Sequence, residues 1–512
     1  MWPRLFRQAL LAAVLALAPA CQEPGSSPQV QLITTTCEGL LPLEGATHLR
    51  LRITGEGISP PIERITPVDL LPLDIPVIPP GENRVIEIRA HSGEHSSAGT
   101  VVSVGRSFPF TMPEEGAPSE PVSVTLYRVN TFIPLESSQQ PGTCLEFVRP
   151  RAGHTATRLA DGRVVVAGGF WLTEAGERET LSSVEILDPR QRTLTSLALP
   201  DSDATRRAFH TASLMLDGRV ALVGGESQSP GGIATPLSTA VVIDPATQRV
   251  QQFSLAEPRS RHAAAADIAG RILLVGGVGA DGSLISSGEG VEPAAGRSFP
   301  VPTPLPRMGA TVVPFQDGQR LAVIGGSDGF EVFREVLMFS FNGTTYSPAT
   351  ANVLLRQGRR DAVAAAFDDG RKLLVLGGYS TAETPDENAR LVGASEVLSL
   401  NPEAPSLSIG PAIVDRGNLC AVGLPGGRVL TAGGRRLGDS GLSSSGVAEL
   451  ITPTQNQTGG ALGMLPITPP RYLHTCTLLP DGSVLIIGGL DEGNGSAQVA
   501  KGIYLFMPVP RD

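Results

Sequence analysis

Short apolar runs alternate with polar turns along most of this chain, and one such unit recurs. Its first copy is His154–Gly169, HTATRLADGRVVVAGG, and close relatives of it begin at His210 and His474. Within the first copy a mixed stretch, Thr155–Leu159, precedes a nearly continuous apolar run, Arg163–Ala167. Such a run is typical of a strand that is covered on both faces. A period of about 50 residues over most of a chain indicates a propeller or a solenoid.

Seven glycine pairs mark seven copies of the unit. Asp161-Gly162 predicts a tight turn between the first two strands, because both positions tolerate positive φ. A third strand ends at Asp188-Pro189, and a weaker fourth, such as Thr193–Leu197, completes the copy. Four antiparallel strands per copy make one blade of a β-propeller. The pairs stand at 168/169, 224/225, 276/277, 325/326, 377/378, 433/434 and 488/489.

The last copy has only three predicted strands, of which the third is Ile503–Met507. We expect Thr143–Val148, just before the first copy, to supply the missing outer strand and so close the ring. Pairing of this kind protects a sheet edge that would otherwise stay unsatisfied.

The region before the repeats has a different pattern. Five β-rich or alternating stretches lie between residues 30 and 135, and Pro/Gly turns separate them without a helical period. This favours a small immunoglobulin-like β-sandwich over 30–135. The expected fold class is therefore all-β, with a seven-bladed propeller over 143–512 behind the sandwich.

The first 20 residues have the features of a signal peptide, because Arg4 and Arg7 precede the apolar run Ala9–Ala20. Cys21 follows small residues and begins a polar tether, 21–29. This junction resembles the lipobox of bacterial lipoproteins, although Ala18 stands where that family favours Leu. The resemblance implies lipidation of Cys21 and anchoring to a bacterial membrane, the outer one being favoured. The alternative is ordinary cleavage and secretion, with Cys21 free or paired.

Composition narrows the possible functions. The 59 Gly and 44 Pro residues suit many short strands joined by tight turns. A net charge of −10 argues against nucleic-acid binding. No Cys/His cluster has zinc-site spacing, and no Ser-His-Asp set, phosphate loop or HExxH is visible. We therefore assign no catalytic residue, no metal ligand and no cofactor.

Four cysteines remain besides Cys21. Cys37 and Cys144 form a possible disulfide between the sandwich and the region after it. Cys420 and Cys476 lie in comparable strands of neighbouring copies, where we expect buried free thiols.

The glycine pair that ends the second strand of each copy resembles the kelch repeat. The likeness covers 143–512, but the Tyr and Trp that usually follow the pair are largely absent, and Trp171 lies too close to it. The variant is similar to bacterial kelch-like lipoproteins and to the propeller of galactose-oxidase-type proteins. The latter resemblance implies a copper ion held by two Tyr and two His, with one Tyr cross-linked to a Cys. Nothing in the five tyrosines of this chain singles out such a set.

One arginine stands just before the first strand of every copy. The innermost strands line the channel of such folds, so we expect these arginines near one mouth, beside the variable loops. They could bind carboxylates or acidic sugars there. Alternatively, each pairs inside its blade with an acid such as Glu185, Glu289 or Glu449, or with loop carbonyls. The seven candidates are Arg151, Arg207, Arg259, Arg307, Arg359, Arg416 and Arg471.

Four copies have a histidine three residues after the arginine, and we expect these side chains to pack between repeats. They are His154, His210, His262 and His474.

From these features we expect a lipid-anchored cell-envelope protein whose propeller is a non-catalytic module that binds a protein or a glycan at the loop-bearing mouth. The alternative is a carbohydrate-active enzyme that uses the same funnel, as a sugar mutarotase or, less readily, a copper radical oxidase. A mutarotase would need a polar acid/base pair in the funnel.

Overall fold

The computed structural model describes residues 27–509, except for 40, 94–98, 119, 198–204, 303–305, 316–317, 349–352, 383–389, 400, 402–404, 439–440, 454–460 and 493–495. The predicted signal peptide over 1–20, Cys21 and most of the predicted tether lie outside the described residues. Within them the only helical element is a 3-10 turn at Val68–Leu70. No helix of the described chain could span a bilayer.

Seven blade sheets follow one another through the described part of the repeat region. In the first six the strands follow chain order from the inside outwards, and the outermost strand of the seventh comes from before the repeats. The first blade consists of β10 (Thr155–Arg158), β11 (Val164–Ala167), β14 (Val184–Asp188) and β15 (Thr193–Ser196). The second and third are β16 (Thr211–Leu214), β17 (Val220–Val223), β20 (Thr239–Asp244) and β21 (Arg249–Ser254), then β22 (Ala263–Ala266), β23 (Ile272–Val275), β24 (Gly288–Glu292) and β25 (Arg297–Val301).

The fourth blade has five strands, because two short outer strands share β28. It consists of β26 (Thr311–Phe315), β27 (Arg320–Ile324), β28 (Glu335–Phe341), β29 (Tyr346–Pro348) and β30 (Val353–Leu354). The fifth and sixth are β31 (Val363–Phe367), β32 (Lys372–Leu376), β33 (Ala394–Ser399) and β34 (Ser406–Ala412), then β35 (Cys420–Leu424), β36 (Arg428–Ala432), β39 (Val447–Ile451) and β40 (Ala461–Pro466). The seventh blade has β41 (Thr475–Leu478), β42 (Val484–Ile487) and β45 (Ile503–Phe506).

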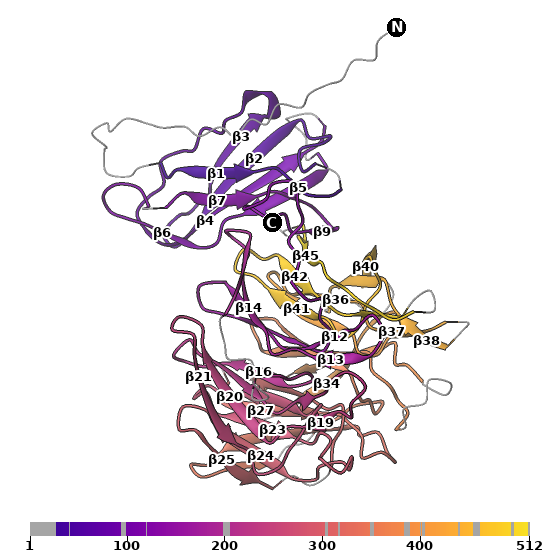
Figure 1. Cartoon of the computed structure of the whole chain (residues 1–512). Helices are drawn as coiled ribbons and strands as arrows, with labels where there is room; N and C mark the ends of the chain where they lie inside the picture. The colour runs from indigo at the N-terminus through magenta and orange to yellow at the C-terminus, as the bar shows by residue number, and fades with distance from the viewer. Residues whose placement is uncertain are drawn as a thin grey trace.

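The ring of blades is closed. Each innermost strand lies beside that of the next blade, and β41 of the seventh blade lies beside β10 of the first. Figure 1 shows the yellow strands β41 and β42 next to β14 of the first blade. The second strands are fully buried between neighbouring blades, whereas the innermost strands are mostly half-buried, as expected for the wall of a central channel.

The outer strand of the seventh blade comes from the N-terminal side, but not from Thr143–Val148 as predicted. The strand β9 (Phe132–Pro134) pairs antiparallel with β45, with Ile133 opposite Leu505. The Phe132 ring packs 5.1 Å from that of Phe506. The chain then turns back, so that Thr143–Val148 makes only isolated bridges. The prediction was wrong because three residues of β9 carry no periodic pattern of their own.

The N-terminal domain is a two-sheet sandwich. One sheet pairs β1 (Val30–Ile33) with β7 (Val122–Thr125) in parallel. The other sheet has the order β3 (Ile62–Pro67), β2 (His48–Thr54), β4 (Gly81–His91), β5 (Val101–Arg106) and β8 (Tyr127–Arg128), with β6 (Phe110–Met112) also on β4. Alternate residues of β2, such as Leu49 and Leu51, are fully buried against Val122 and Val124 of the first sheet.

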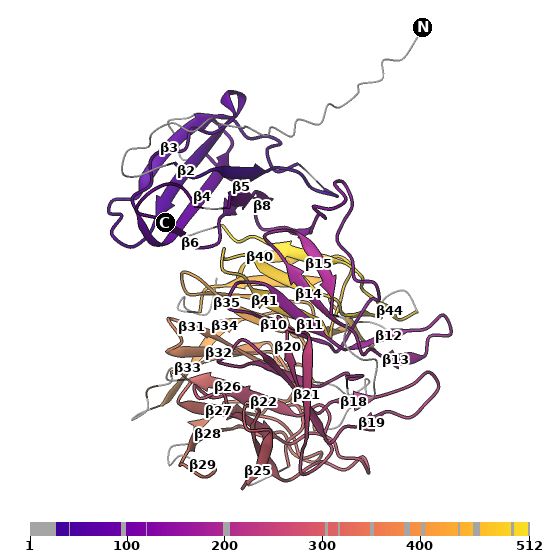
Figure 2. The ribbon, with the colours of Figure 1, turned by 60° about the vertical axis from the view of Figure 1, so that its left-hand side comes forward.

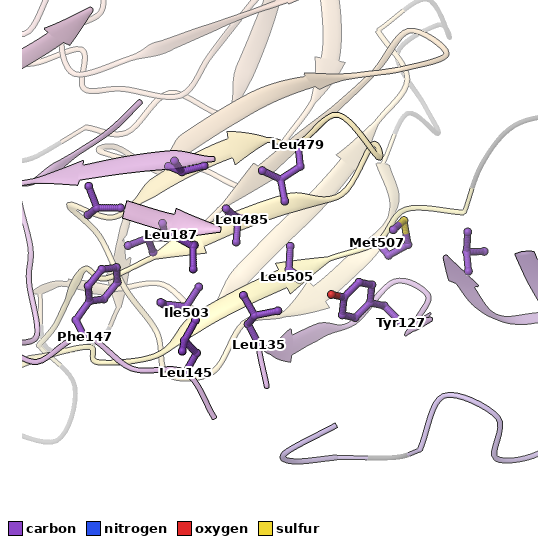
Figure 3. Packing of buried hydrophobic residues seen from close by; sticks show 14 residues of the cluster. Tyr127, Leu135, Leu145, Phe147, Leu187, Leu479, Leu485, Ile503, Leu505 and Met507 are labelled. Carbon is purple, nitrogen blue, oxygen red and sulfur yellow. The ribbon is translucent and has the colours of Figure 1, made fainter. Parts of the chain in front are cut away.

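A shared hydrophobic cluster joins the sandwich to the first and seventh blades. Figure 3 shows Tyr127 of the sandwich beside Leu135, Leu505 and Met507. The Phe108 ring lies against the Asp-Gly turn of the first blade, at Gly162. The sandwich therefore rests on the side of the propeller that carries the short turns. In Figure 2 it lies next to β14, β15 and β40.

Two disulfides are present in the described residues. Cys37 pairs with Cys144, across the domain junction. Cys420 pairs with Cys476, which corrects our expectation of two free thiols there. The reason is positional: the two side chains come from neighbouring innermost strands and face each other across one blade interface.

Candidate functional site

The seven arginines of the repeated column are buried inside the blades, with exposures of 0–2%. In every blade the arginine Nη1 donates to the carbonyl of the first glycine of the pair, as Arg207 does to Gly224 at 2.9 Å. The guanidinium group thus joins the start of the first strand to the end of the second.

Most of these arginines also pair with an acid on the third strand. Arg151 contacts Glu185, Arg416 contacts Glu449, and Arg259 lies 3.1 Å from Glu289. These are the intra-blade pairs that the sequence suggested. Arg359–Glu396 and Arg307–Glu335 follow the same pattern at 2.6 and 3.8 Å.

In two blades the third-strand position equivalent to Glu185 is not an acid but Val241 or Tyr504. Arg207 donates to the Thr239 hydroxyl at 3.3 Å, and Arg471 lies 4.7 Å from the centre of the Tyr504 ring. Burial lowers the pKa of Arg207 to about 9, which still leaves it charged at neutral pH. The column therefore holds blades together internally, and a ligand at the mouth does not reach these groups without opening the blades.

The glycine pairs join neighbouring blades. The second glycine of each pair donates its N–H to the carbonyl of the next blade's arginine, as Gly169 does to Arg207 at 2.9 Å. Gly489 closes the circle by donating to Arg151 at 2.9 Å. The first glycine has positive φ, and a Cβ at Gly168 would lie 2.2 Å from the Arg207 carbonyl oxygen. Only glycine fits both requirements.

The four histidines bridge blades, in agreement with a packing role. His210 Nε2 lies 2.9 Å from the Thr155 hydroxyl of the preceding blade, and His262 lies 2.9 Å from Thr211. His154 lies 3.1 Å from Thr475, across the point of closure. Burial, with help from the neighbouring arginine, lowers the pKa of His262 to about 3, so the imidazoles are neutral at physiological pH.

One residue per blade, two positions after the arginine, has a left-handed backbone, with φ between 51° and 64°. Several of these residues bond head to tail around the axis: Phe209 N–H donates to Gly153 at 2.9 Å, and Asp361 N–H to Gly309 at 2.7 Å. We call these seven residues the mouth ring. They are Gly153, Phe209, Arg261, Gly309, Asp361, Asn418 and Leu473.

The mouth ring lies at the loop-bearing end of the channel. The residue before each ring member bridges to the residue after a glycine pair, as Ala208 does to Glu226, and the variable loops start there. Figure 2 shows these loops gathered along one side of the propeller, where β12 (Phe170–Leu172), β13 (Arg178–Thr180), β18 (Glu226–Ser227), β19 (Thr235–Pro236) and β44 (Gln498–Val499) are labelled.

The left-handed conformation costs a non-glycine residue roughly 1–2 kcal/mol. Five of the seven ring members are not glycine and adopt this conformation. Backbone strain of this kind gathers at functional sites. The ring was not found from the sequence because its members share a conformation and not a residue type. The one signal in the sequence was its place between the two columns, two residues after the arginine and directly before the histidine position.

Asp361 is the carboxylate of the mouth ring. Its Oδ2 accepts from Arg360 Nη1 at 2.5 Å, and its side chain is 27% exposed. Arg360 itself is buried and also donates to the Thr381 carbonyl at 2.8 Å. Gly309 leaves room for the carboxylate, since a Cβ there would lie 2.6 Å from Asp361 Oδ1. The arrangement presents one oriented, partly accessible carboxylate at the mouth.

Asn418, the next ring member, is positioned by a buried tyrosine. Tyr379 donates from its hydroxyl to Asn418 Oδ1 at 2.9 Å, and the Arg360 guanidinium lies 4.7 Å from the centre of its ring. A Cβ at Gly417 would lie 2.2 Å from the same ring. Asp361 and Asn418 therefore belong to one polar network supported from behind by Arg360 and Tyr379.

The other half of the mouth is mixed. Arg261 lies 3.9 Å from the centre of the Phe209 ring and 3.1 Å from Glu226. Where the loops of the sixth and seventh blades meet, Tyr472 donates to Glu492 at 2.5 Å, and Arg435 of the sixth blade lies 3.0 Å from Glu492. These groups surround the mouth with both apolar and charged side chains.

The copper set of galactose-oxidase-type proteins does not fit these residues. Tyr379 and Tyr472 are the tyrosines at the mouth, and their hydroxyls donate to Asn418 and Glu492. The histidines are held between blades. In the described chain, the one group of at least three His, Cys, Asp or Glu side chains with ligand atoms within 4.8 Å is Cys420, His474 and Cys476.

No protein-family model and no curated protein sequence matches this chain. Among solved structures it is similar to a fungal alcohol oxidase of the AA5 family in complex with copper, at 19% identity and a TM-score of 0.53, over 71% of this chain and 76% of the oxidase. It also matches the structure of YjhT, at 13% identity and a TM-score of 0.45, over 72% and 97% of the two chains.

The protein therefore has a β-propeller fold, similar to that of the AA5 alcohol oxidase. The solved structure that shares this fold is an enzyme, and this finding corrects our expectation of a non-catalytic protein- or glycan-binding module. At 19% identity it establishes the fold and transfers no substrate to this chain.

Proposed function

We propose that the protein is a carbohydrate-active enzyme whose active site is the loop-bearing mouth, and that it interconverts sugar anomers as a mutarotase does. The observation that carries the proposal is Asp361, an oriented and partly exposed carboxylate on a strained ring at the channel mouth. Asp361 would supply the base of the acid/base pair that a mutarotase needs, and water at the mouth would supply the acid.

In this proposal Asp361 acts as the general base. Its carboxylate accepts the proton of the anomeric hydroxyl while the ring C–O bond breaks and water at the mouth protonates the ring oxygen. The open-chain carbonyl rotates, and the reverse steps close the ring as the other anomer. Arg360 orients the carboxylate, and Asn418, held by Tyr379, offers an amide to a sugar hydroxyl. An alcohol oxidation through copper is not proposed, because the residues at the mouth do not form that ligand set.

The test is anomer interconversion, followed by polarimetry or exchange NMR over a panel of neutral and acidic aldoses. We expect acceleration by the wild type and a loss of about 10²–10⁴-fold in Asp361→Asn. Asp217→Asn is the matched control, because Asp217 lies in an Asp-Gly turn of the second blade and bonds Arg219 at 2.8 Å. Equal rates with and without protein for every sugar would sink the proposal.

We also propose that lipidated Cys21 anchors the protein in the cell envelope. Because the sandwich rests on the turn-bearing side, an anchor ahead of it would leave the loop-bearing mouth facing away from the membrane. Metabolic labelling with palmitate should mark the wild type and not Cys21→Ser, and equal label in both would contradict the anchor.

A further inference from the structure

The interface between the sixth and seventh blades differs chemically from the other six. At the first position of the innermost strand the other blades have threonine, alanine or valine, and the sixth has Cys420. At the second position of the innermost strand the first six blades have alanine or valine, and the seventh blade has Cys476. At the interface of the first two blades, the equivalent residues are Thr155 and Ala212. Both replacements thus fall at one interface, on opposite sides of it, where the two cysteines meet in a disulfide.

A histidine completes the group. His474 Nε2 lies 3.1 Å from Cys420 Sγ, in the place where other histidines of the column contact a threonine hydroxyl. Cys420 Sγ, Cys476 Sγ and a ring nitrogen of His474 all lie within 4.8 Å of one another. Two sulfurs and an imidazole nitrogen are a donor set for a soft or borderline metal ion, such as Zn²⁺.

The sulfur pair is not needed to join these blades. Gly434 N–H donates to the Arg471 carbonyl at 2.8 Å, which is the same joint that the other interfaces use. Both cysteines are half-buried on innermost strands, so that small solutes in the channel can approach them. The group is therefore an addition to a complete interface and lies on the channel wall.

We propose that Cys420, Cys476 and His474 form a redox-gated metal site of the zinc class. A dithiol reductant transfers two electrons and two protons to the disulfide, giving two thiols and the oxidised reductant. Metal binding then releases the thiol protons, and the ion takes two thiolates and the imidazole. Three protein ligands leave one tetrahedral position for water or a substrate group. A disulfide-bearing oxidant then takes two electrons from the two thiolates and two protons from water, and leaves as a dithiol. The Cys420–Cys476 disulfide forms again, two ligands are lost and the ion is released.

The test uses the full chain with Cys21→Ser, Cys37→Ser and Cys144→Ser, so that Cys420 and Cys476 are the two that remain of five cysteines. The protein is first reduced with dithiothreitol, and the dithiothreitol is then removed under anaerobic conditions. The reduced protein is titrated with Co²⁺, and Zn²⁺ is added afterwards as a competitor. We expect one ion per chain, with thiolate-to-cobalt charge-transfer absorption that Zn²⁺ abolishes. Oxidised protein should take up none.

Two variants locate the ligands. Cys420→Ser should abolish the absorption, and His474→Gln should weaken binding by more than about 10-fold. His154→Gln is the matched control, since His154 faces Thr475 at an interface without cysteines. If the triple variant does not fold, bound Co²⁺ is compared between the reduced wild type and Cys420→Ser/Cys476→Ser. The proposal fails if reduced protein binds no ion, or if the loss of Cys420 changes nothing. Neither result depends on the sugar chemistry of the mouth.

Discussion

The arginine column and the mouth ring are two residues apart in the sequence of each blade. They differ in which property is repeated from blade to blade. The column repeats a residue, and each copy is buried with the same carbonyl partner. The mouth ring repeats a backbone conformation, and its side chains range from glycine to Phe209 and Asp361. In a propeller, a repeated side chain marks a structural joint, whereas varied side chains on a repeated backbone mark a place where function can differ.

The largest effect should come from removing a column arginine. Arg359→Ala leaves Glu396 buried without its cation, and loss of one partner of a buried pair costs about 3–5 kcal/mol. Arg261→Ala removes a ring arginine whose side chain is 43% exposed, and should cost about 1 kcal/mol or less. Urea unfolding of both variants measures the difference. Equal losses would remove the distinction between column and ring.

A smaller effect should come from the glycine pairs. Gly224→Ala puts a Cβ 2.5 Å from the Arg259 carbonyl oxygen at a φ of +56°, and should cost more than 2 kcal/mol. Gly218→Ala is the control: it has φ of +83° but open space around the new Cβ, and should cost about 1 kcal/mol. The excess in Gly224→Ala, seen in thermal or urea unfolding, isolates the joint between blades. No excess would mean that the blades shift freely.

A single histidine should give the smallest effect, and one that depends on pH. Their folded pKa is lowered from the ordinary 6.5, to about 3 for His262, so the unfolded chain takes up protons first as the pH falls. Stability is thus complete above pH 6.5 and falls below it, by about 1.4 kcal/mol per pH unit for each histidine.

The matched variant for this effect is Thr211→Ala/His262→Ala, which reproduces the alanines Ala263 and Ala310 of the next interface. Between pH 7 and 5 the unfolding free energy of this variant should fall less steeply with pH than that of the wild type. The difference in slope should correspond to one proton fewer taken up on unfolding. An unchanged slope would show that His262 is protonated in the folded state.

The architecture could be predicted from the sequence because its determinants are local and repeated. Asp-Gly turns, apolar second strands and glycine pairs each fix one part of a blade, and seven repetitions make the period plain. The acids that pair with Arg151, Arg259 and Arg416 were also predictable, because each stands four residues before the proline of the turn that ends its third strand.

The candidate site could not be predicted in the same way. Asp361, Asn418 and Phe209 occur once each at the ring position, so no repetition distinguishes them from loop residues. Their proximity depends on closure of the ring and on left-handed backbones at residues that do not require them. The Cys420–Cys476 pairing was missed for a related reason, because it depends on which faces of two neighbouring strands meet.

The pairing of β9 with β45 has a consequence for biogenesis. β9 emerges from the ribosome before every other blade strand, and its partner emerges after every other one. A nascent chain therefore holds an open arc of blades, and the sheet edge at each end of the arc is unpaired. Pairing of β9 with β45 is therefore the last step in closing the ring of blades. Until that step, both unpaired edges can bind a chaperone or a second nascent copy.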